Sequence, residues 1–187
     1  MVVVDDNGDM VFGDVNDASK RRQTYFCAFS FVPAATPTNV LEIIGAANKV
    51  VEVVSIRISG ASASTNGYRI SLLRRSTLNT GGTPTSQTIV SAASTNTASG
   101  VTVRSYTANP SGLGTLVGGV TEEVLTLLST TAATFRTPND LLLSRTDASQ
   151  GVILSSATDT LCVNLQGVAT APTRLDFSII FREYIGA

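Results

Sequence analysis

Residues 174–183 read RLDFSIIFRE and predict a β-strand more clearly than any other segment of the chain. Apolar and polar side chains alternate along it, with the period of two that a strand with one buried face requires. The row expected to be buried is Leu175, Phe177, Ile179 and Phe181, and it faces away from Asp176, Ser178, Ile180 and Arg182.

From residue 25 onward, the other segments also have the pattern of β-strands. They are short apolar or alternating runs separated by Gly, Pro and Asn turns, and no window sustains apolar spacing at three and four residues with caps at both ends. Residues 121–128 could form a short helix capped by Thr121, but the Thr and Val within them disfavour it. Eight to ten such strands predict an all-β, antiparallel β-sandwich of jelly-roll-like topology.

Two segments within this domain have unusual patterns. The alternation in residues 49–60 changes parity near Glu52–Val54, which predicts a β-bulge or bend there. Residues 76–100 are rich in Ser, Thr, Asn, Gly and Ala. We expect them to form a long loop that projects outward, with a short strand around Gln87–Ser91.

Residues 1–24 differ from the rest and are predicted to form an extended N-terminal arm, with the sandwich domain at 25–187. The arm carries five Asp residues before the basic run Lys20-Arg21-Arg22, and it is expected to become ordered on contact with a partner. Asp5, Asn7 and Asp9 resemble the opening of a calcium loop. However, Met10 and Asn16 stand where such loops have Gly and Glu, so a solvated arm or tight turn is favoured and no metal or other cofactor is expected.

The composition disfavours most kinds of catalysis. The 187 residues include no His, which removes Ser-His-Asp and Cys-His sites and the usual zinc sites. Glu122 and Glu123 are adjacent, so on a strand they point to opposite faces and cannot act on one bond. Cys27 and Cys162 are interpreted as small buried residues and not as a disulfide. We therefore expect the protein not to be an enzyme.

The charge pattern points to protein partners. The formal net charge is −1 and only 14% of residues are charged, while Thr (25) and Ser (20) are abundant. Nucleic-acid binding is not expected from this balance, and neither a signal peptide nor a membrane-spanning segment is predicted. A surface of neutral hydroxyl groups is compatible with packing against other subunits, although an ordinary β protein with Thr and Ser on its exposed strand faces fits equally well.

Three segments resemble those of tailed-bacteriophage structural proteins. They are TPTNVLEIIG (36–45) followed by residues 53–60, LLRRSTLNTGGT (72–83), and VRSYTANP (103–110) with Leu113-Gly114. The resemblance covers roughly residues 34–183 and implies a virion protein, made in the host cytoplasm, with no catalytic residues to transfer. A capsid decoration or cement protein that binds the major capsid protein is the favoured role. A tail, baseplate or fibre subunit and a carbohydrate-binding attachment module remain as alternatives.

The candidate partner-binding residues are two short basic runs. Lys20, Arg21 and Arg22 could dock onto an acidic patch of a neighbouring subunit, although a solvated charge run is equally consistent with the pattern. Arg74 and Arg75 form the second run. The protein is expected to form a homo-oligomer, either a dimer or a trimer.

Overall fold

The computed structural model describes residues 3–4, 10–11, 22–129, 139–142 and 151–185. These residues form β-strands and turns, with no helix among them. The strands are β1 (Val3–Val4), β2 (Met10–Val11), β3 (Gln23–Phe31), β4 (Asn39–Ile44), β5 (Lys49–Ala61), β6 (Asn66–Arg75), β7 (Thr83–Ser86), β8 (Val90–Ser91), β9 (Thr102–Ala108), β10 (Leu116–Leu127), β11 (Asn139–Leu142), β12 (Val152–Leu154), β13 (Thr160–Asn164) and β14 (Arg174–Ile185).

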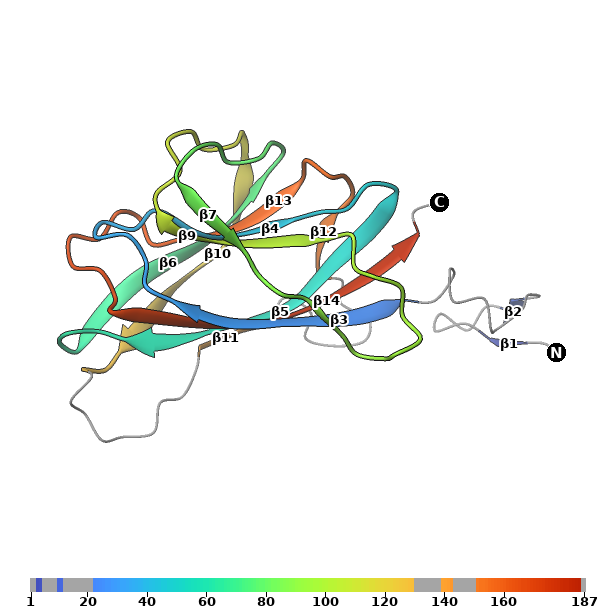
Figure 1. Cartoon of the computed structure of the whole chain (residues 1–187), viewed down its shortest axis with the longest axis horizontal. Helices are drawn as coiled ribbons and strands as arrows, with labels where there is room; N and C mark the ends of the chain where they lie inside the picture. The colour runs from blue at the N-terminus through green and yellow to red at the C-terminus, as the bar shows by residue number, and fades with distance from the viewer. Residues whose placement is uncertain (1–2, 5–9, 12–21, 130–138, 143–150, 186–187) are drawn as a thin grey trace.

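Two antiparallel sheets pack face to face, which confirms the predicted β-sandwich (Figure 1). One sheet has the order β10-β6-β13-β4-β9-β7, and the other has the order β11-β5-β14-β3-β8, with β12 also paired to β5. From β3 to β6, successive strands alternate between the two sheets. Such crossings are the kind of connection that a jelly-roll-like sandwich uses. β1 and β2 pair with each other.

β14 lies between β3 and β5, and its alternation is the one that the sequence predicts. Leu175, Phe177, Ile179 and Phe181 are all buried in the core between the sheets. The ring of Phe181 stacks on Tyr25 of β3, with the ring centroids 5.5 Å apart. In the opposite sheet, Leu41 of β4 and its neighbours on β6, β9 and β13 complete the same core.

The parity change in β5 is a β-bulge at Val54, as predicted. Ile180 pairs with Ser55 while Phe181 pairs with Val53, so Val54 has no opposite residue on β14. The bulge allows Val53 and Ile56 to face the same core, where both are fully buried. Val54 itself is only half-buried, because the bulge turns it out of the row that Ile56 and Ile58 occupy.

Residues 76–100 do not form the expected projecting loop. β7 pairs with β9 at the edge of one sheet, and β8 pairs with β3 at the edge of the other. The segment therefore crosses from sheet to sheet and covers part of one side of the sandwich, as the green ribbon in Figure 1 shows. Pairing with these edges supplies backbone hydrogen bonds that a solvated loop would take from water.

Two further differences concern boundaries. β10 begins at Leu116 and runs through the Gly118-Gly119 pair, so residues 121–128 are strand and the short-helix alternative is wrong. β3 begins at Gln23, within the stretch assigned to the arm. Cys27 and Cys162 are both buried and free, as expected. Within the described part of the chain, no helix is long and apolar enough to cross a membrane.

The adjacent residues Ile179 and Ile180 test this packing, because they have the same side chain on opposite faces of β14. Ile179 is 0% exposed, whereas Ile180 is only half-buried. Ile179→Ala is expected to lower the free energy of unfolding by about 2–5 kcal/mol, as for other buried Ile residues, and Ile180→Ala by clearly less. Urea denaturation would measure both, and equal losses would contradict the assigned faces.

Candidate functional site

The first predicted basic run lies mostly outside the described residues. Lys20 and Arg21 are in that part of the chain, as are Asp5, Asn7 and Asp9. Arg22 is described and exposed, and its guanidinium carbon lies 5.5 Å from the ring centroid of Tyr184 on β14. This cation–π contact fixes the entry of the chain into β3.

Arg74 and Arg75 do not form a common basic surface. Arg74 keeps 39% of its side chain exposed and lies 3.5 Å from the carboxylate of Asp159. Arg75 is buried and donates a hydrogen bond to the carbonyl of Gly114. Neighbouring residues of a strand point to opposite faces, so of these two only Arg74 presents its guanidinium to solvent.

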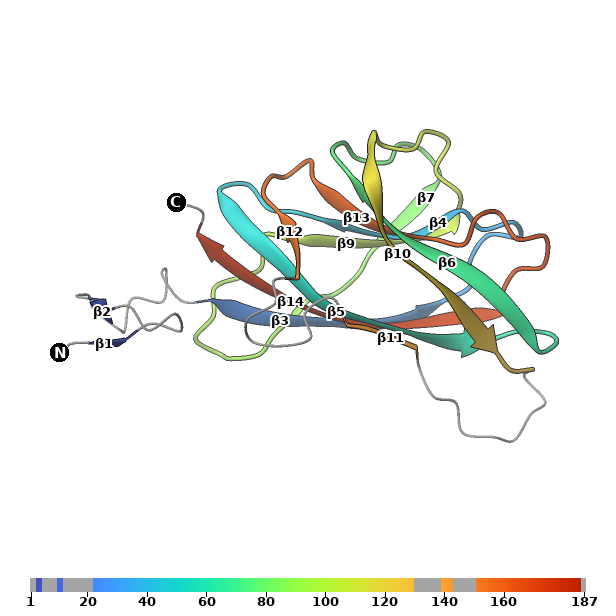
Figure 2. The same ribbon diagram turned by 180° about the vertical axis from the view of Figure 1, so that it is seen from behind.

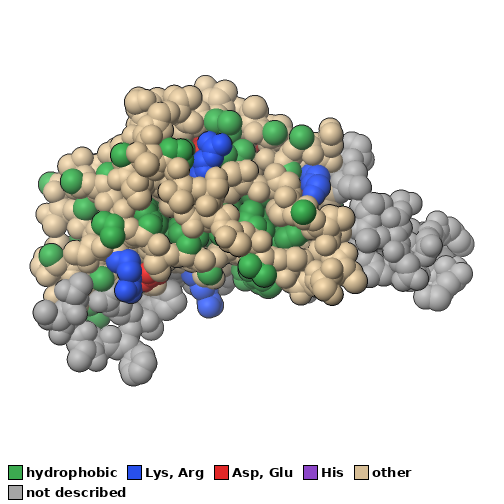
Figure 3. Space-filling view, viewed as in Figure 1, with side chains coloured by type: hydrophobic (Ala, Val, Ile, Leu, Met, Phe, Trp, Pro, Cys, Tyr) green, Lys and Arg blue, Asp and Glu red, His purple; other side chains and the backbone are tan. Residues whose placement is uncertain are grey.

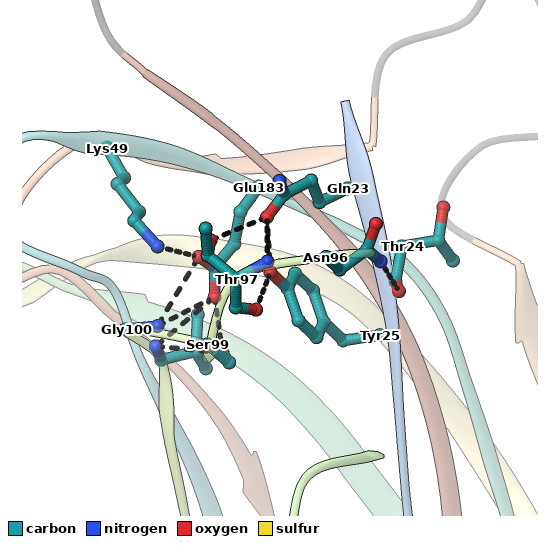
Figure 4. A network of polar contacts seen from close by, with 10 residues as sticks. Gln23, Thr24, Tyr25, Lys49, Asn96, Thr97, Ser99, Gly100 and Glu183 are labelled. Atoms are coloured by element: carbon teal, nitrogen blue, oxygen red, sulfur yellow. Dashed lines mark hydrogen bonds and ion pairs between the residues drawn. The ribbon is translucent and has the colours of Figure 1, made fainter. Parts of the chain in front are cut away.

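Glu183 is at the centre of the polar network in Figure 4. Its carboxylate is almost fully buried and lies 2.6 Å from the ammonium nitrogen of Lys49. It also accepts hydrogen bonds from the Ser99 hydroxyl and from the backbone N–H groups of Gly100 and Val101. One carboxylate on β14 thus fixes the end of the crossing segment to the sandwich.

A second set of contacts fixes the same segment to β3. The side-chain oxygen of Gln23 accepts hydrogen bonds from the hydroxyl groups of Tyr25 (2.6 Å) and Thr97 (2.8 Å). Asn96 donates through its amide to the carbonyl of Thr24 at 3.2 Å. Burial raises the pKa of Tyr25, so its hydroxyl stays protonated and remains a donor.

A shallow hollow of about 280 Å³ lies beside this network. It is lined by small or neutral side chains: Tyr25, Gln87, Ile89, Ser91, Thr97, Ala98 and Ser99. Its polar side chains already have hydrogen-bond partners within the protein, so the hollow offers few orienting groups to a small molecule.

Glu42 anchors a second pair of loops on the outer face of the other sheet. It is fully buried and accepts hydrogen bonds from the backbone N–H of Asn79 (2.9 Å) and from the hydroxyl of Tyr106 (2.6 Å). Asn79 in turn accepts a hydrogen bond from the backbone N–H of Gly114. This arrangement holds the loops that follow β6 and β9 together over the sheet.

Glu52 has the same role in the sheet that contains β5. It is buried, accepts a hydrogen bond from the backbone N–H of Gly151 at 3.0 Å, and lies 3.8 Å from Arg182. Each of the three buried carboxylates therefore holds a loop backbone and has a cation or hydroxyl partner. Among the described residues, no group of three or more His, Cys, Asp or Glu is placed to hold a metal ion.

The feature that sequence reasoning missed is a set of exposed apolar side chains on β10 and in the turn before it. We call it the β10 surface: Leu113, Leu116, Val117, Val120 and Val124, each between 40% and 62% exposed. β10 is the outermost strand of its sheet and lies outside β6 (Figure 2). The stretch 113–120 contains four apolar residues, which could have indicated an exposed apolar strand. Its glycines, however, gave it the pattern of a flexible turn.

Gly118 and Gly119 lie within the β10 surface and are not needed to fill space in the sandwich. A Cβ added at either position would meet no atom within 4 Å. The absence of side chains therefore leaves the backbone of β10 open to close approach from outside.

Glu183→Ala is expected to lower the free energy of unfolding by about 2–3 kcal/mol, somewhat below the value for fully buried pairs because Lys49 is 24% exposed. It removes the acceptor of the Gly100 and Val101 amides, so their hydrogen exchange should also accelerate. Urea denaturation and hydrogen-exchange NMR would measure these effects. The control, Lys49→Met, removes the ion pair but keeps Glu183 as the acceptor, so the exchange of these amides should stay close to that of the wild type. Unchanged exchange in Glu183→Ala would refute the anchoring role.

The two thiols predict a loss of stability at alkaline pH. Burial raises the pKa of Cys27 and of Cys162 from 9.0 to about 11. The unfolded chain therefore releases these protons at lower pH than the folded chain, and the stability present below pH 9.0 is lost as the pH rises toward about 11. Urea denaturation across this range should show the fall. It should be shallower for Cys27→Ala, and an equal slope would contradict the assignment.

Comparison of the chain with known protein families, with curated proteins and with solved structures finds no match.

Proposed function

We propose that this protein is a non-enzymatic structural subunit of a tailed-bacteriophage particle, a capsid decoration or cement protein that binds the major capsid lattice. The observation that carries the proposal is the β10 surface. Four large apolar side chains exposed along one outermost strand, with Leu113 just before it, are more than the isolated exposed apolar residues of an ordinary monomer and are typical of a protein-binding surface.

The low overall charge of the chain also suits binding to another protein. Only 14% of the residues are charged, and the face displayed in Figure 3, on the other side of the molecule from β10, consists mostly of neutral polar groups and backbone. Depletion of charge is characteristic of the buried part of protein–protein interfaces, because each charge placed there must be desolvated. The bound partner is therefore expected to contact β10 mainly through apolar and hydroxyl groups.

The loops of the sandwich are held in place before any partner binds. Glu42, Glu52 and Glu183 each accept hydrogen bonds from a loop backbone. A surface that is already ordered loses little conformational entropy on binding. On a repeating lattice, many such modest contacts would together stabilise the particle.

The resemblance of residues 36–45, 72–83 and 103–110 to phage structural proteins supports the same setting. Residues 72–83 cover the end of β6 and the loop held by Glu42, and residues 103–110 cover β9 and the loop beyond it. The resembling segments therefore coincide in part with the framework next to the β10 surface.

The proposal is tested by counting copies in purified particles by quantitative mass spectrometry. Hundreds of copies per particle, comparable to the major capsid protein, are expected for a cement protein. Val117→Lys places a charge in the β10 surface and is expected to lower incorporation about ten-fold or more, because the charge must be desolvated in the contact.

The matched control is Thr65→Lys, which adds the same charge at an exposed position of the β5–β6 turn, at the other end of β6. It should be incorporated like the wild type. Copies in the range of a few to some tens would overturn the capsid role and favour a tail position. Absence from the particle would overturn the virion assignment.

A further inference from the structure

β3 has an outer edge that is only partly covered. Tyr25 pairs with Ser91 and Phe26 with Val90, and the backbone N–H of Ala92 donates to the carbonyl of Thr24. Beyond Phe26, no described residue pairs with the outer edge of β3, although β3 continues to Phe31. Within the described part of the chain, the stretch from Cys27 to Phe31 is therefore an open sheet edge.

The direction of the backbone groups along this edge follows from the contact with Ala92. The Thr24 carbonyl points away from β14, toward Ala92. In an antiparallel ladder, the N–H and C=O of one residue point to the same side and alternate along the strand. Since β3 pairs with β14 without a register shift, Ala28 and Ser30 direct their N–H and C=O groups outward.

The open edge has few of the features that normally prevent sheets from pairing. Proteins protect such edges with charged residues, proline or bulges. Residues 27–31 are Cys, Ala, Phe, Ser and Phe, so they carry no charge, and the first proline after them is Pro33. Ala28 and Ser30 are also small enough to let another strand approach.

We propose that this edge pairs with the same edge of a second copy of the chain, in an antiparallel two-fold arrangement centred on Phe29. This register places Ala28 of one copy opposite Ser30 of the other, so the outward N–H and C=O groups of both residues find partners. The two Phe29 rings then lie opposite each other, and Phe31 faces Cys27 of the second copy. No like charges meet across the two-fold axis.

The packing of side chains agrees with this register. Phe29 already stacks on Phe177 with the ring centroids 5.6 Å apart, and Phe31 lies 6.1 Å from Phe177. Phe29 and Phe31 are only half-buried, because they line the open edge. Pairing two copies would join both aromatic clusters and cover these rings, which adds to the backbone hydrogen bonds.

The large apolar side chains exposed outside the β10 surface also fit this arrangement. They are Phe26 (42% exposed), Val32 (61%) and Val90 (58%). In the proposed register, Val32 of one copy lies just beyond the last paired residue, near Phe26 and Val90 of the other copy. All of these side chains would therefore gather at the two ends of the shared ladder.

The position of β8 selects a second copy over a long foreign strand. β8 occupies the edge at Tyr25 and Phe26, so an incoming strand can pair only along residues 27–31. Along residues 27–31, the two-fold register pairs the outward N–H and C=O groups of Ala28 and Ser30 on both chains. Each chain then uses the same surface, as an isologous interface requires. The dimer does not depend on the virion assignment, since it uses a different edge from the β10 surface.

The first test is the mass of the full-length chain by light scattering at concentrations from about 1 μM to about 1 mM. A dimer is expected. Ser30→Pro removes an outward N–H that bonds only across the proposed interface, and it should raise the dissociation constant about ten-fold or more. Ser30→Ala keeps that N–H and should dimerise like the wild type.

The second test reads the register and does not require Ser30→Pro to fold. Residues of a hydrogen-bonded pair have Cα atoms about 5.5 Å apart, within the span of a disulfide. A mixture of Ala28→Cys chains with Ser30→Cys chains should therefore form a cross-linked heterodimer on oxidation, whereas either variant alone should cross-link at least about ten times more slowly.

A wild-type chain that remains monomeric throughout this range would overturn the inference. So would a dimer that Ser30→Pro leaves intact while the mixed cysteine variants fail to cross-link, because such a dimer must use another surface. Both tests use the isolated protein, so their failure is distinguishable from absence of the protein in particles.

Discussion

The sandwich depends on the burial of one row of side chains on β14. Leu175, Phe177, Ile179 and Phe181 must be covered by the opposite sheet, and they fix the faces of β3 and β5, which pair with β14 on either side. The bulge at Val54 follows from the same constraint, because without it β5 could not present both Val53 and Ile56 to the core. Register in a sheet is strongly specified wherever one face is buried, and here a single strand transmits that specification to both neighbours.

Buried carboxylates explain how a chain with so few charges orders its loops. Glu42, Glu52 and Glu183 accept hydrogen bonds from backbone N–H groups in loops that follow other strands. A buried carboxylate without such partners would be very unfavourable, so each one requires its loop to adopt a single position. These three carboxyl groups thus act inside the fold, where they hold loops, and are not presented to a partner. Two separate parts of the protein surface, the β10 surface and the β3 edge, remain available for contacts with other chains.

Alternation in the sequence was enough to predict the fold class, the buried row of β14 and the bulge in β5, because burial of one face leaves a period of two in the residue types. It was not enough for β10, where Gly118-Gly119 and the irregular pairing around Val117 and Val120 hide the period. The candidate site was harder to predict. Arg74 and Arg75 are adjacent in sequence, but only the loop carbonyl of Gly114 determines that Arg75 is buried. The partners of the buried carboxylates are backbone groups, which any residue supplies, so no residue pattern identifies them.

The position of β14 also has a consequence for biosynthesis. Among the described strands it is the last to be synthesised, yet it occupies the middle of its sheet, between β5 and β3. Until β14 has been synthesised, the edges of β3 and β5 that face each other have no strand to pair with. The domain therefore completes its folding only after β14 has left the ribosome, through contacts between residues far apart in the chain, which form slowly. A truncated chain without residues 174–185 would lack the strand that joins β3 to β5. Such a chain is expected to remain unfolded and to be bound by chaperones or degraded, and not to form a smaller version of the same fold.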